Sequence, residues 1–222
     1  EGSFEEPIIL ATTGEIEQVI KINKGWTWLS LNVNKFGGFT PGAVLKPLDC
    51  DSSTLLKGKL GYTQYYVENK EWVGELDTLE IAEMYKLKYH QNTFLPVVGR
   101  KINADATPIS INSGWNWLGY IPRTSMSVAD ALASLNPQDG DWVKNQYDFA
   151  VFDSYEWQGT LKAMTPGEGY LFYSSVPQTR TLTYPDATVA DSRIRKTTDT
   201  DNTEKLYNSD YPNNMNVIAV VM

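Results

Sequence analysis

Two pairs of tryptophans are the clearest candidates for chemistry in this sequence. Trp26 and Trp28 are separated by one residue, and Trp115 and Trp117 repeat the arrangement. Residues two apart on a β-strand share a face, so each pair is expected to present two indole rings side by side. Such rings can stack on sugar rings. They can equally pack against a neighbouring part of the protein, which is the commoner use of tryptophan.

Two short acidic runs could coordinate Ca²⁺. Asp139 and Asp141 flank a glycine, and Asp199 and Asp201 flank a threonine. Carboxylate oxygens are the ligands that Ca²⁺ prefers. Neither run completes a calcium-binding loop, and Asp-Gly is also ordinary turn chemistry. The sequence therefore allows a Ca²⁺ site at either run and indicates no other cofactor.

Residues for catalysis are sparse, and we expect that the protein is not an enzyme. Glu71 and Glu156 could serve as a glycosidase pair, but they lie in different halves of the chain. His90 is the only histidine, and no Gly-x-Ser-x-Gly elbow accompanies it. The sequence also lacks phosphate-loop and dinucleotide-binding motifs.

Charge and hydropathy narrow the set of partners. The formal net charge of −8 argues against a nucleic-acid partner, because proteins of that class gather lysine and arginine against the phosphate backbone. No apolar run approaches the ~20 residues that cross a bilayer as a helix, so we expect no transmembrane segment. The single Cys50 fits either the cytoplasm or a bacterial exterior where folding does not depend on disulfides.

The tryptophan pairs belong to an internal repeat. Gly25–Leu29 reads Gly-Trp-Thr-Trp-Leu, and Gly114–Leu118 reads Gly-Trp-Asn-Trp-Leu. A second block containing Trp-x-Gly-x-Leu follows each pair, beginning at Trp72 and again at Trp157. Self-similarity of this kind indicates a tandem duplication.

The second copy is four residues shorter between these blocks, since 89 residues separate Trp26 from Trp115 and 85 separate Trp72 from Trp157. This alignment pairs Lys59 with Lys144. We expect the extra residues of the first copy in the loop around 36–41 or 50–53.

Each copy predicts a mostly β unit of five or six short strands plus one short helix, as a sandwich or small barrel. Thr40-Pro41 can begin a short helix that ends near Leu48. Ser127 is the expected N-cap of a helix that Asn136-Pro137 ends. The strands are expected at residues 7–12, 16–22, 26–33, 63–67, 72–76, 84–89, 148–152, 157–161 and 169–174. The expected domains are residues 1–105, residues 106–185, and a polar linker with a terminal strand at 186–222.

The apolar run Val217–Met222 must be covered if it forms a strand, because natural sheet edges avoid exposing such segments. It can pair within the chain, continue into a further domain, or insert into a neighbouring molecule. In the last case Val217, Ile218 and Val220 would mediate assembly of a filament.

The order of the motifs resembles a repeat in large secreted or surface-anchored proteins of Bacteroidetes-type bacteria and other aquatic microbes. The second copy carries it as Gly-Trp-Asn-Trp at 114–117, Gly140-Asp141 with Lys144 and Gln146, Trp157–Leu161, and Pro-Gly-Glu-Gly-Tyr at 166–170. The first copy departs from it at 81–85, which reads Ile-Ala-Glu-Met-Tyr. The resemblance implies an extracellular, multidomain and non-enzymatic setting, and it supplies no ligand.

We therefore expect a non-enzymatic structural or adhesive module of an extracellular or cell-surface microbial protein. It would be a polymerising subunit if the terminal strand inserts into a neighbouring molecule. Its partners would be other chains or domains of the same surface assembly. The alternative is a carbohydrate-binding module that holds glycans with the tryptophan pairs. Exposure of the four indole rings distinguishes the structural module from the carbohydrate-binding module, because buried rings cannot stack on a sugar.

Overall fold

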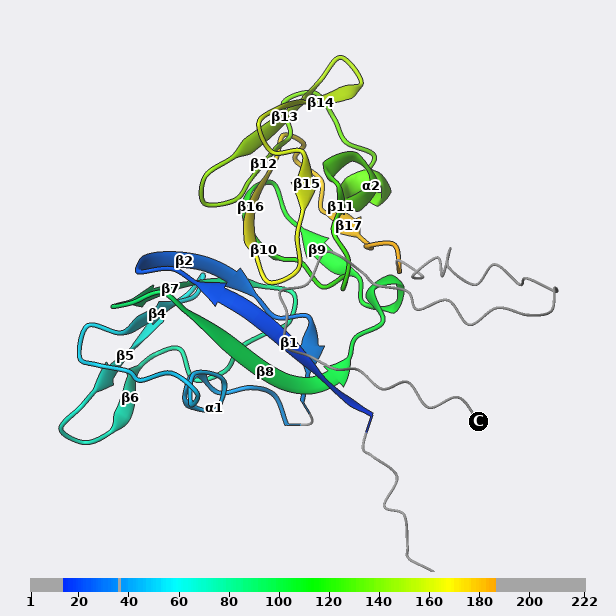
Figure 1. Ribbon diagram of the computed structural model, residues 1–222. Coiled ribbons are helices and arrows are strands. Elements are labelled where there is room, and N and C mark those ends of the chain that lie inside the picture. The colour runs from blue at the N-terminus through cyan, green and yellow to red at the C-terminus, as the bar shows by residue number, and fades with distance from the viewer. Residues whose placement is uncertain (1–13, 36, 187–222) are drawn as a thin grey trace, which may run out of the picture. The chain divides into compact units, whose positions relative to one another are not determined.

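A computed structural model describes residues 14–35 and 37–186 of the chain (Figure 1). The structure is mostly β, with 47% strand and 9% helix, and its two halves correspond to the two copies of the repeat. The expected strand at 7–12 lies outside the described residues. So do Asp199, Asp201 and the assembly residues Val217, Ile218 and Val220.

The two copies build five-stranded antiparallel sheets with the same strand order. The first sheet has the order β2 (Gly25–Ser30), β7 (Met84–Tyr89), β4 (Leu55–Lys57), β5 (Tyr62–Tyr66) and β6 (Glu71–Gly74). The second has the order β10 (Gly114–Gly119), β16 (Gly169–Ser174), β12 (Trp142–Lys144), β13 (Phe149–Asp153) and β14 (Glu156–Gly159). A tandem duplication predicts a common strand order, and the two sheets have it.

Shorter sheets accompany the two main ones. They are β1 (Glu15–Ile22), β8 (Thr93–Lys101) and β3 (Val33–Asn34) in the order β1-β8-β3, β9 (Ile109–Ile111) with β17 (Arg180–Leu182), and β11 (Met126–Ser127) with β15 (Ala163–Met164). Strand β8 is missing from the predicted strands because Pro96 lies inside it, and proline cannot donate a ladder hydrogen bond.

The helices begin where their capping residues predict. In α1 (Pro41–Val44), Thr40 Oγ1 accepts a hydrogen bond from Ala43 N at 3.2 Å, but the helix ends before the expected Leu48. In α2 (Val128–Leu132), Ser127 Oγ accepts from Asp130 N at 3.0 Å, as expected for the N-cap. Two 3₁₀ turns are η1 (Ala104–Ala106) and η2 (Ala133–Leu135).

The four-residue difference between the copies falls in two places rather than one. The offset is 89 residues between the starts of β2 and β10, 87 between β5 and β13, and 85 between β6 and β14. The second copy has thus lost two residues before its helix, near the predicted loop. It has lost two more in the turn between β13 and β14, which corresponds to the turn between β5 and β6. Lys144 consequently matches Lys57, which corrects the alignment with Lys59.

Each repeat has its own hydrophobic core on the inner face of its sheet. The first core runs from Ile20 to Val97 in sequence, and the second from Ile102 to Tyr184. Leu29 and Leu118 face these cores with 1% and 0% of their surface exposed. The second core therefore begins at Ile102, slightly before the expected domain boundary after residue 105.

A glycine inside a strand pattern predicts a bulge or a close backbone approach, here one that could accommodate a tryptophan ring. The glycines of the Trp-x-Gly-x-Leu motifs do mark close backbone approaches. Gly74 and Gly159 have φ angles of +155° and +145°. A Cβ atom at either position would overlap a backbone carbonyl oxygen, that of Tyr62 or Phe149 respectively. The neighbour is thus a backbone carbonyl and not the indole ring that the sequence suggested, so only glycine fits.

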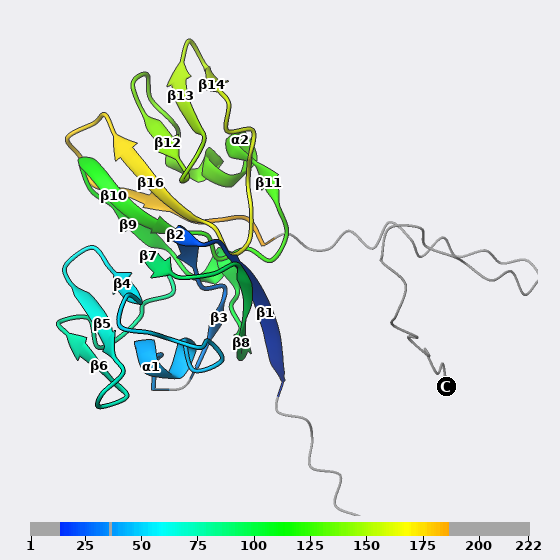
Figure 2. The ribbon, with the colours of Figure 1, turned by 60° about the vertical axis from the view of Figure 1, so that its left-hand side comes forward.

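The two repeats pack through β2, β7, β10 and β16, which lie close together in Figure 2. Ser30 N donates to Gly167 O at 3.1 Å, and Gly119 N donates to Ala82 O at 2.8 Å. Ser30 is equivalent to Gly119, and Ala82 is equivalent to Gly167, so the same contact is made in both directions. The junction therefore has the approximate two-fold relation of an isologous interface.

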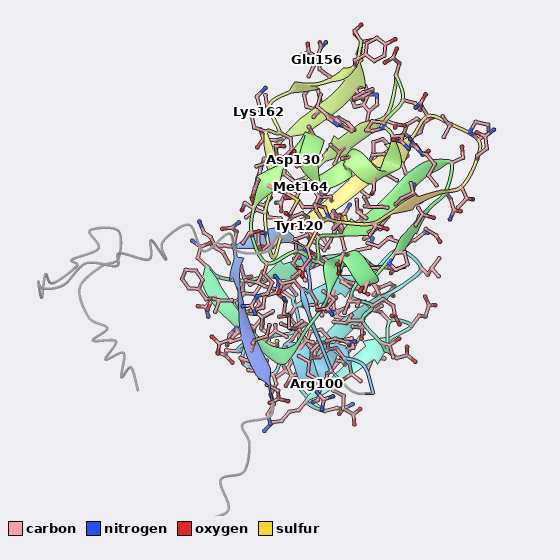
Figure 3. The ribbon with its side chains drawn as sticks, turned by 90° about the vertical axis from the view of Figure 1, so that its right-hand side faces the viewer. Arg100, Tyr120, Asp130, Glu156, Lys162 and Met164 are labelled. Atoms are coloured by element: carbon pink, nitrogen blue, oxygen red, sulfur yellow. The ribbon has the colours of Figure 1, made fainter. Side chains whose placement is uncertain are left out.

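Tyr120, labelled in Figure 3, also links the repeats at this junction. Its backbone N–H donates to Ser30 Oγ at 3.1 Å, while its ring packs edge-on against Tyr170 and Tyr184 in the second core. A Cβ at Gly119 would lie 2.7 Å from Ile81 O, so the glycine permits the close approach.

Candidate functional site

The tryptophan pairs lie on the outer faces of the two sheets, opposite the cores. Trp26 and Trp115 are 38% and 51% exposed, whereas Trp28 and Trp117 are half-buried. The strand alternation explains this arrangement, because the intervening residues and the following leucines face inward. The four rings therefore divide into two exposed ones and two at the junction between the repeats.

The two half-buried rings hold a lysine between the repeats. Lys86 Nζ lies 4.1 Å from the ring centroid of Trp28 and 4.7 Å from that of Trp117. Lys144 Nζ lies 5.5 Å from the Trp28 ring. Since an ammonium group over an indole face is attracted by it, these contacts give Trp28 and Trp117 a packing role at the junction.

The exposed ring of the second repeat belongs to a longer row. Trp115, Tyr173 and Trp142 are directly opposite one another on three neighbouring strands. Trp115 meets Tyr173 edge-on at 5.2 Å, and Phe149 stacks on Trp142 at 5.8 Å and 20°. Trp142 and Phe149 are 41% and 44% exposed. We call Trp115, Tyr173, Trp142 and Phe149 the aromatic row.

The aromatic row is specific to the second repeat. The strand equivalences place Lys88, Leu55 and Tyr62 of the first repeat at the positions of Tyr173, Trp142 and Phe149. Trp115 was the only member predicted from the sequence, because it alone has the same residue type at the equivalent position of the other copy. The alternation within 169–174, together with a tryptophan at position 142, was the available signal.

Lysines gather beside the tryptophans on the first sheet. Lys57 is directly opposite Lys86, which is directly opposite Trp28. Burial lowers the pKa of Lys86, and the charges of Lys144 and Lys57 lower it further. The ion pairs among residues 14–35 and 37–186 are His90–Asp51, Lys101–Asp186 and Arg180–Asp141, so none neutralises these lysines.

Gln146 closes the edge of the first sheet. Its Oε1 accepts from Trp28 N at 3.0 Å, and its Nε2 donates to Trp26 O at 2.8 Å. The side-chain amide thereby takes the place of a neighbouring strand on the outer edge of β2. Lys144 and Gln146, both part of the sequence motif, thus contact the tryptophan strand of the other repeat.

Replacing Gln146 with alanine should destabilise the protein by about 1 kcal/mol, because two hydrogen bonds to a strand edge are lost and water replaces them only in part. Chemical denaturation measures this change. Gln158→Ala is the matched control, since that amide contacts only the exposed Glu156 side chain. Equal unfolding midpoints for the two variants would show that Gln146 does not secure the edge.

The Asp139 and Asp141 run is not an open cation site in this fold. Asp141 is fully buried, and its two oxygens accept from the Arg180 guanidinium at 2.8 Å each. Its carboxylate also accepts from Ser175 N and from Gln138 N. The guanidinium therefore occupies the place of the Ca²⁺ ion that the sequence suggested. Across the described part of the chain, no group of three or more His, Cys, Asp or Glu side chains could hold a metal ion.

A cleft of about 400 Å³ lies between the repeats, beside Trp28 and Gln146. Within it, Glu168 Oε2 accepts from Asn145 Nδ2 at 3.1 Å and from Tyr170 OH at 2.9 Å. The two glutamates considered as a glycosidase pair, on β6 and β14, lie at the outer ends of separate sheets. The fold therefore does not bring that pair together.

Comparison of the chain with protein-family models, curated proteins and solved structures found no match. None of the helices among the described residues is long and apolar enough to span a membrane.

Proposed function

We propose that this chain is a non-enzymatic adhesive module of an extracellular or cell-surface protein, and that it binds polysaccharide through the aromatic row. The observation that supports this proposal best is the row itself. Its rings come from four neighbouring strands of one sheet face, and none of them contributes to a core. A contiguous exposed apolar surface of this kind typically marks a binding site.

The shape of the aromatic row suits a sugar chain. The C–H faces of a sugar ring pack against flat aromatic rings, while its hydroxyl groups stay in contact with water. Trp115 and Trp142 are on strands two apart in the sheet, which separates them by roughly 10 Å. That spacing suits neighbouring units of an extended glycan. Tryptophan and tyrosine also lose little conformational entropy on binding.

The proposed extracellular location and the further partners are based on the sequence. The motif resemblance favours an extracellular, multidomain protein, in which other domains or chains of the same assembly are partners alongside glycans. Assembly through Val217–Met222 stays a prediction, because that segment lies outside the described residues.

Replacing Trp115 and Trp142 together with alanine should weaken polysaccharide binding about tenfold to hundredfold, since two stacking rings are removed. Sedimentation with insoluble polysaccharides and affinity electrophoresis through soluble ones measure the change. The control Phe94→Ala/Val98→Ala removes exposed apolar side chains from β8 instead. The proposal fails if the double variant binds as well as the unchanged protein, or if the unchanged protein binds no glycan.

A further inference from the structure

Three lysines form a cluster that adjoins the aromatic row. Lys86 and Lys144 both lie over the Trp28 ring, with Nζ atoms 4.1 and 5.5 Å from its centroid. Lys57 is directly opposite Lys86 on the adjacent strand. We call Lys57, Lys86 and Lys144 the lysine cluster. It combines residues of both repeats at their junction.

The mutual repulsion of the three lysines is not offset by an acidic partner among the described residues. Like charges directly opposite each other on neighbouring strands destabilise a sheet. The chain has 27 acidic and 19 basic residues, yet within the described ranges no ion pair involves these three lysines. An arrangement that gathers positive charge on an acidic protein is therefore explained better by a negatively charged ligand than by stability.

The cluster is also partly preorganised. The ammonium group of Lys86 lies between the rings of Trp28 and Trp117. A lysine held in this way loses less conformational freedom when a ligand binds than one extended into water. Its compact charge can pair with a carboxylate or a sulfate without strict directional requirements.

The lysine cluster meets the aromatic row at Lys144. Lys144 is directly opposite Phe149 on the next strand and two residues from Trp142 on its own strand, so all three share a sheet face. A glycan that stacks on the row therefore places the substituents of neighbouring sugar units near the lysines.

From this geometry we infer that the polysaccharide is anionic, with carboxylate or sulfate groups that bind Lys57, Lys86 and Lys144. This inference rests on the proposed function and specifies its ligand. A nucleic acid would offer phosphates to the same lysines, but three lysines are few for a phosphate backbone, whose protein partners gather lysine and arginine over a larger surface.

The variant Lys86→Gln/Lys144→Gln tests the inference. The probes are polygalacturonate for carboxylate, dextran sulfate for sulfate, unmodified dextran and cellohexaose as neutral glycans, a single-stranded oligonucleotide, and vesicles containing anionic phospholipid. We expect the unchanged protein to bind at least one acidic glycan and the variant to bind it about tenfold more weakly. Binding by the unchanged protein should also weaken as salt is raised.

The control Lys46→Gln/Lys162→Gln makes the same change in net charge at exposed positions outside the cluster; Lys162 is labelled in Figure 3. Acidic glycan binding that weakens only in the cluster variant supports the inference, and the two acidic probes then separate carboxylate from sulfate. If the protein binds a neutral glycan and Lys86→Gln/Lys144→Gln does not weaken that binding, the inference is overturned but the proposed function stands. Equal or tighter binding of the oligonucleotide or the vesicles overturns the inference, and absence of all glycan binding overturns both.

Discussion

Replacing Arg180 with methionine should destabilise the protein by about 3–5 kcal/mol, because the buried charge of Asp141 would lose its partner. The Arg180 side chain is only 13% exposed, and that of Asp141 is fully buried. Folded domains are typically stable by about 5–15 kcal/mol, so this loss is a large part of the total. Urea denaturation at neutral pH measures it directly.

The effect of Arg180→Met should depend on pH. Burial favours the neutral acid, but the hydrogen bonds that Asp141 accepts from Arg180 and from backbone N–H groups outweigh it and lower its pKa. Because the pKa of Asp141 is lower in the folded than in the unfolded protein, its carboxylate adds stability at pH values above the unfolded pKa of about 3.9. This stability is lost as the pH falls through the pKa of the folded protein. Without Arg180, burial should raise the pKa, so the variant gains stability as pH falls towards about 4.

The gap in stability between the unchanged protein and Arg180→Met should therefore narrow on acidification. As a control, Arg180→Met/Asp141→Asn removes both charges and should recover part of the loss. The ion pair does not stabilise the second repeat if the difference in unfolding free energy is constant from pH 7 to pH 3. The same conclusion follows if Arg180→Met is as stable as the unchanged protein.

Replacing Trp157 with alanine should cost about 2–3 kcal/mol, which is less than the ~3–5 of a fully buried tryptophan. The sequence predicts Trp72 and Trp157 to be equivalent and largely buried. They are equivalent, each meeting one aromatic ring at 5.4 Å, but both are half-buried beside their cores. Thermal unfolding followed by circular dichroism measures the loss.

Two further variants define the role of Trp157. Trp142→Ala removes an exposed tryptophan from the same sheet and should leave the unfolding midpoint nearly unchanged. Trp157→Phe keeps most of the ring and removes a buried indole N–H that has no partner among the described residues, so it should cost little. A midpoint for Trp157→Ala equal to that of Trp142→Ala would contradict the packing role.

Much of the fold could be predicted from the sequence because its signals are local. The cap at Ser127 and the glycines at positions 74 and 159 depend on chemistry within a few residues or on one strand neighbour. That the two sheets share one strand order followed from the duplication, whereas the order itself did not, and the alignment of Lys59 with Lys144 was wrong by two residues. The turn between β5 and β6 has no residue type that would have revealed its shortening.

The candidate site could be predicted only in part, because it depends on register across strands and between repeats. Trp115 was identified from its spacing, whereas Tyr173 and Trp142 become its neighbours only once β16 lies between β10 and β12. The position of Lys86 between Trp28 and Trp117 likewise depends on how the repeats pack. No local pattern encodes that contact, since the two tryptophans are far apart in sequence.

Binding through the aromatic row can be tested by an NMR titration of the isotopically labelled protein with oligosaccharides of the glycan it binds most tightly. We expect the indole N–H signals of Trp115 and Trp142 to shift with added oligosaccharide, while those of Trp72 and Trp157 stay in place. Shifts confined to Trp72 and Trp157, or no indole shift at saturating oligosaccharide, would contradict binding through the aromatic row.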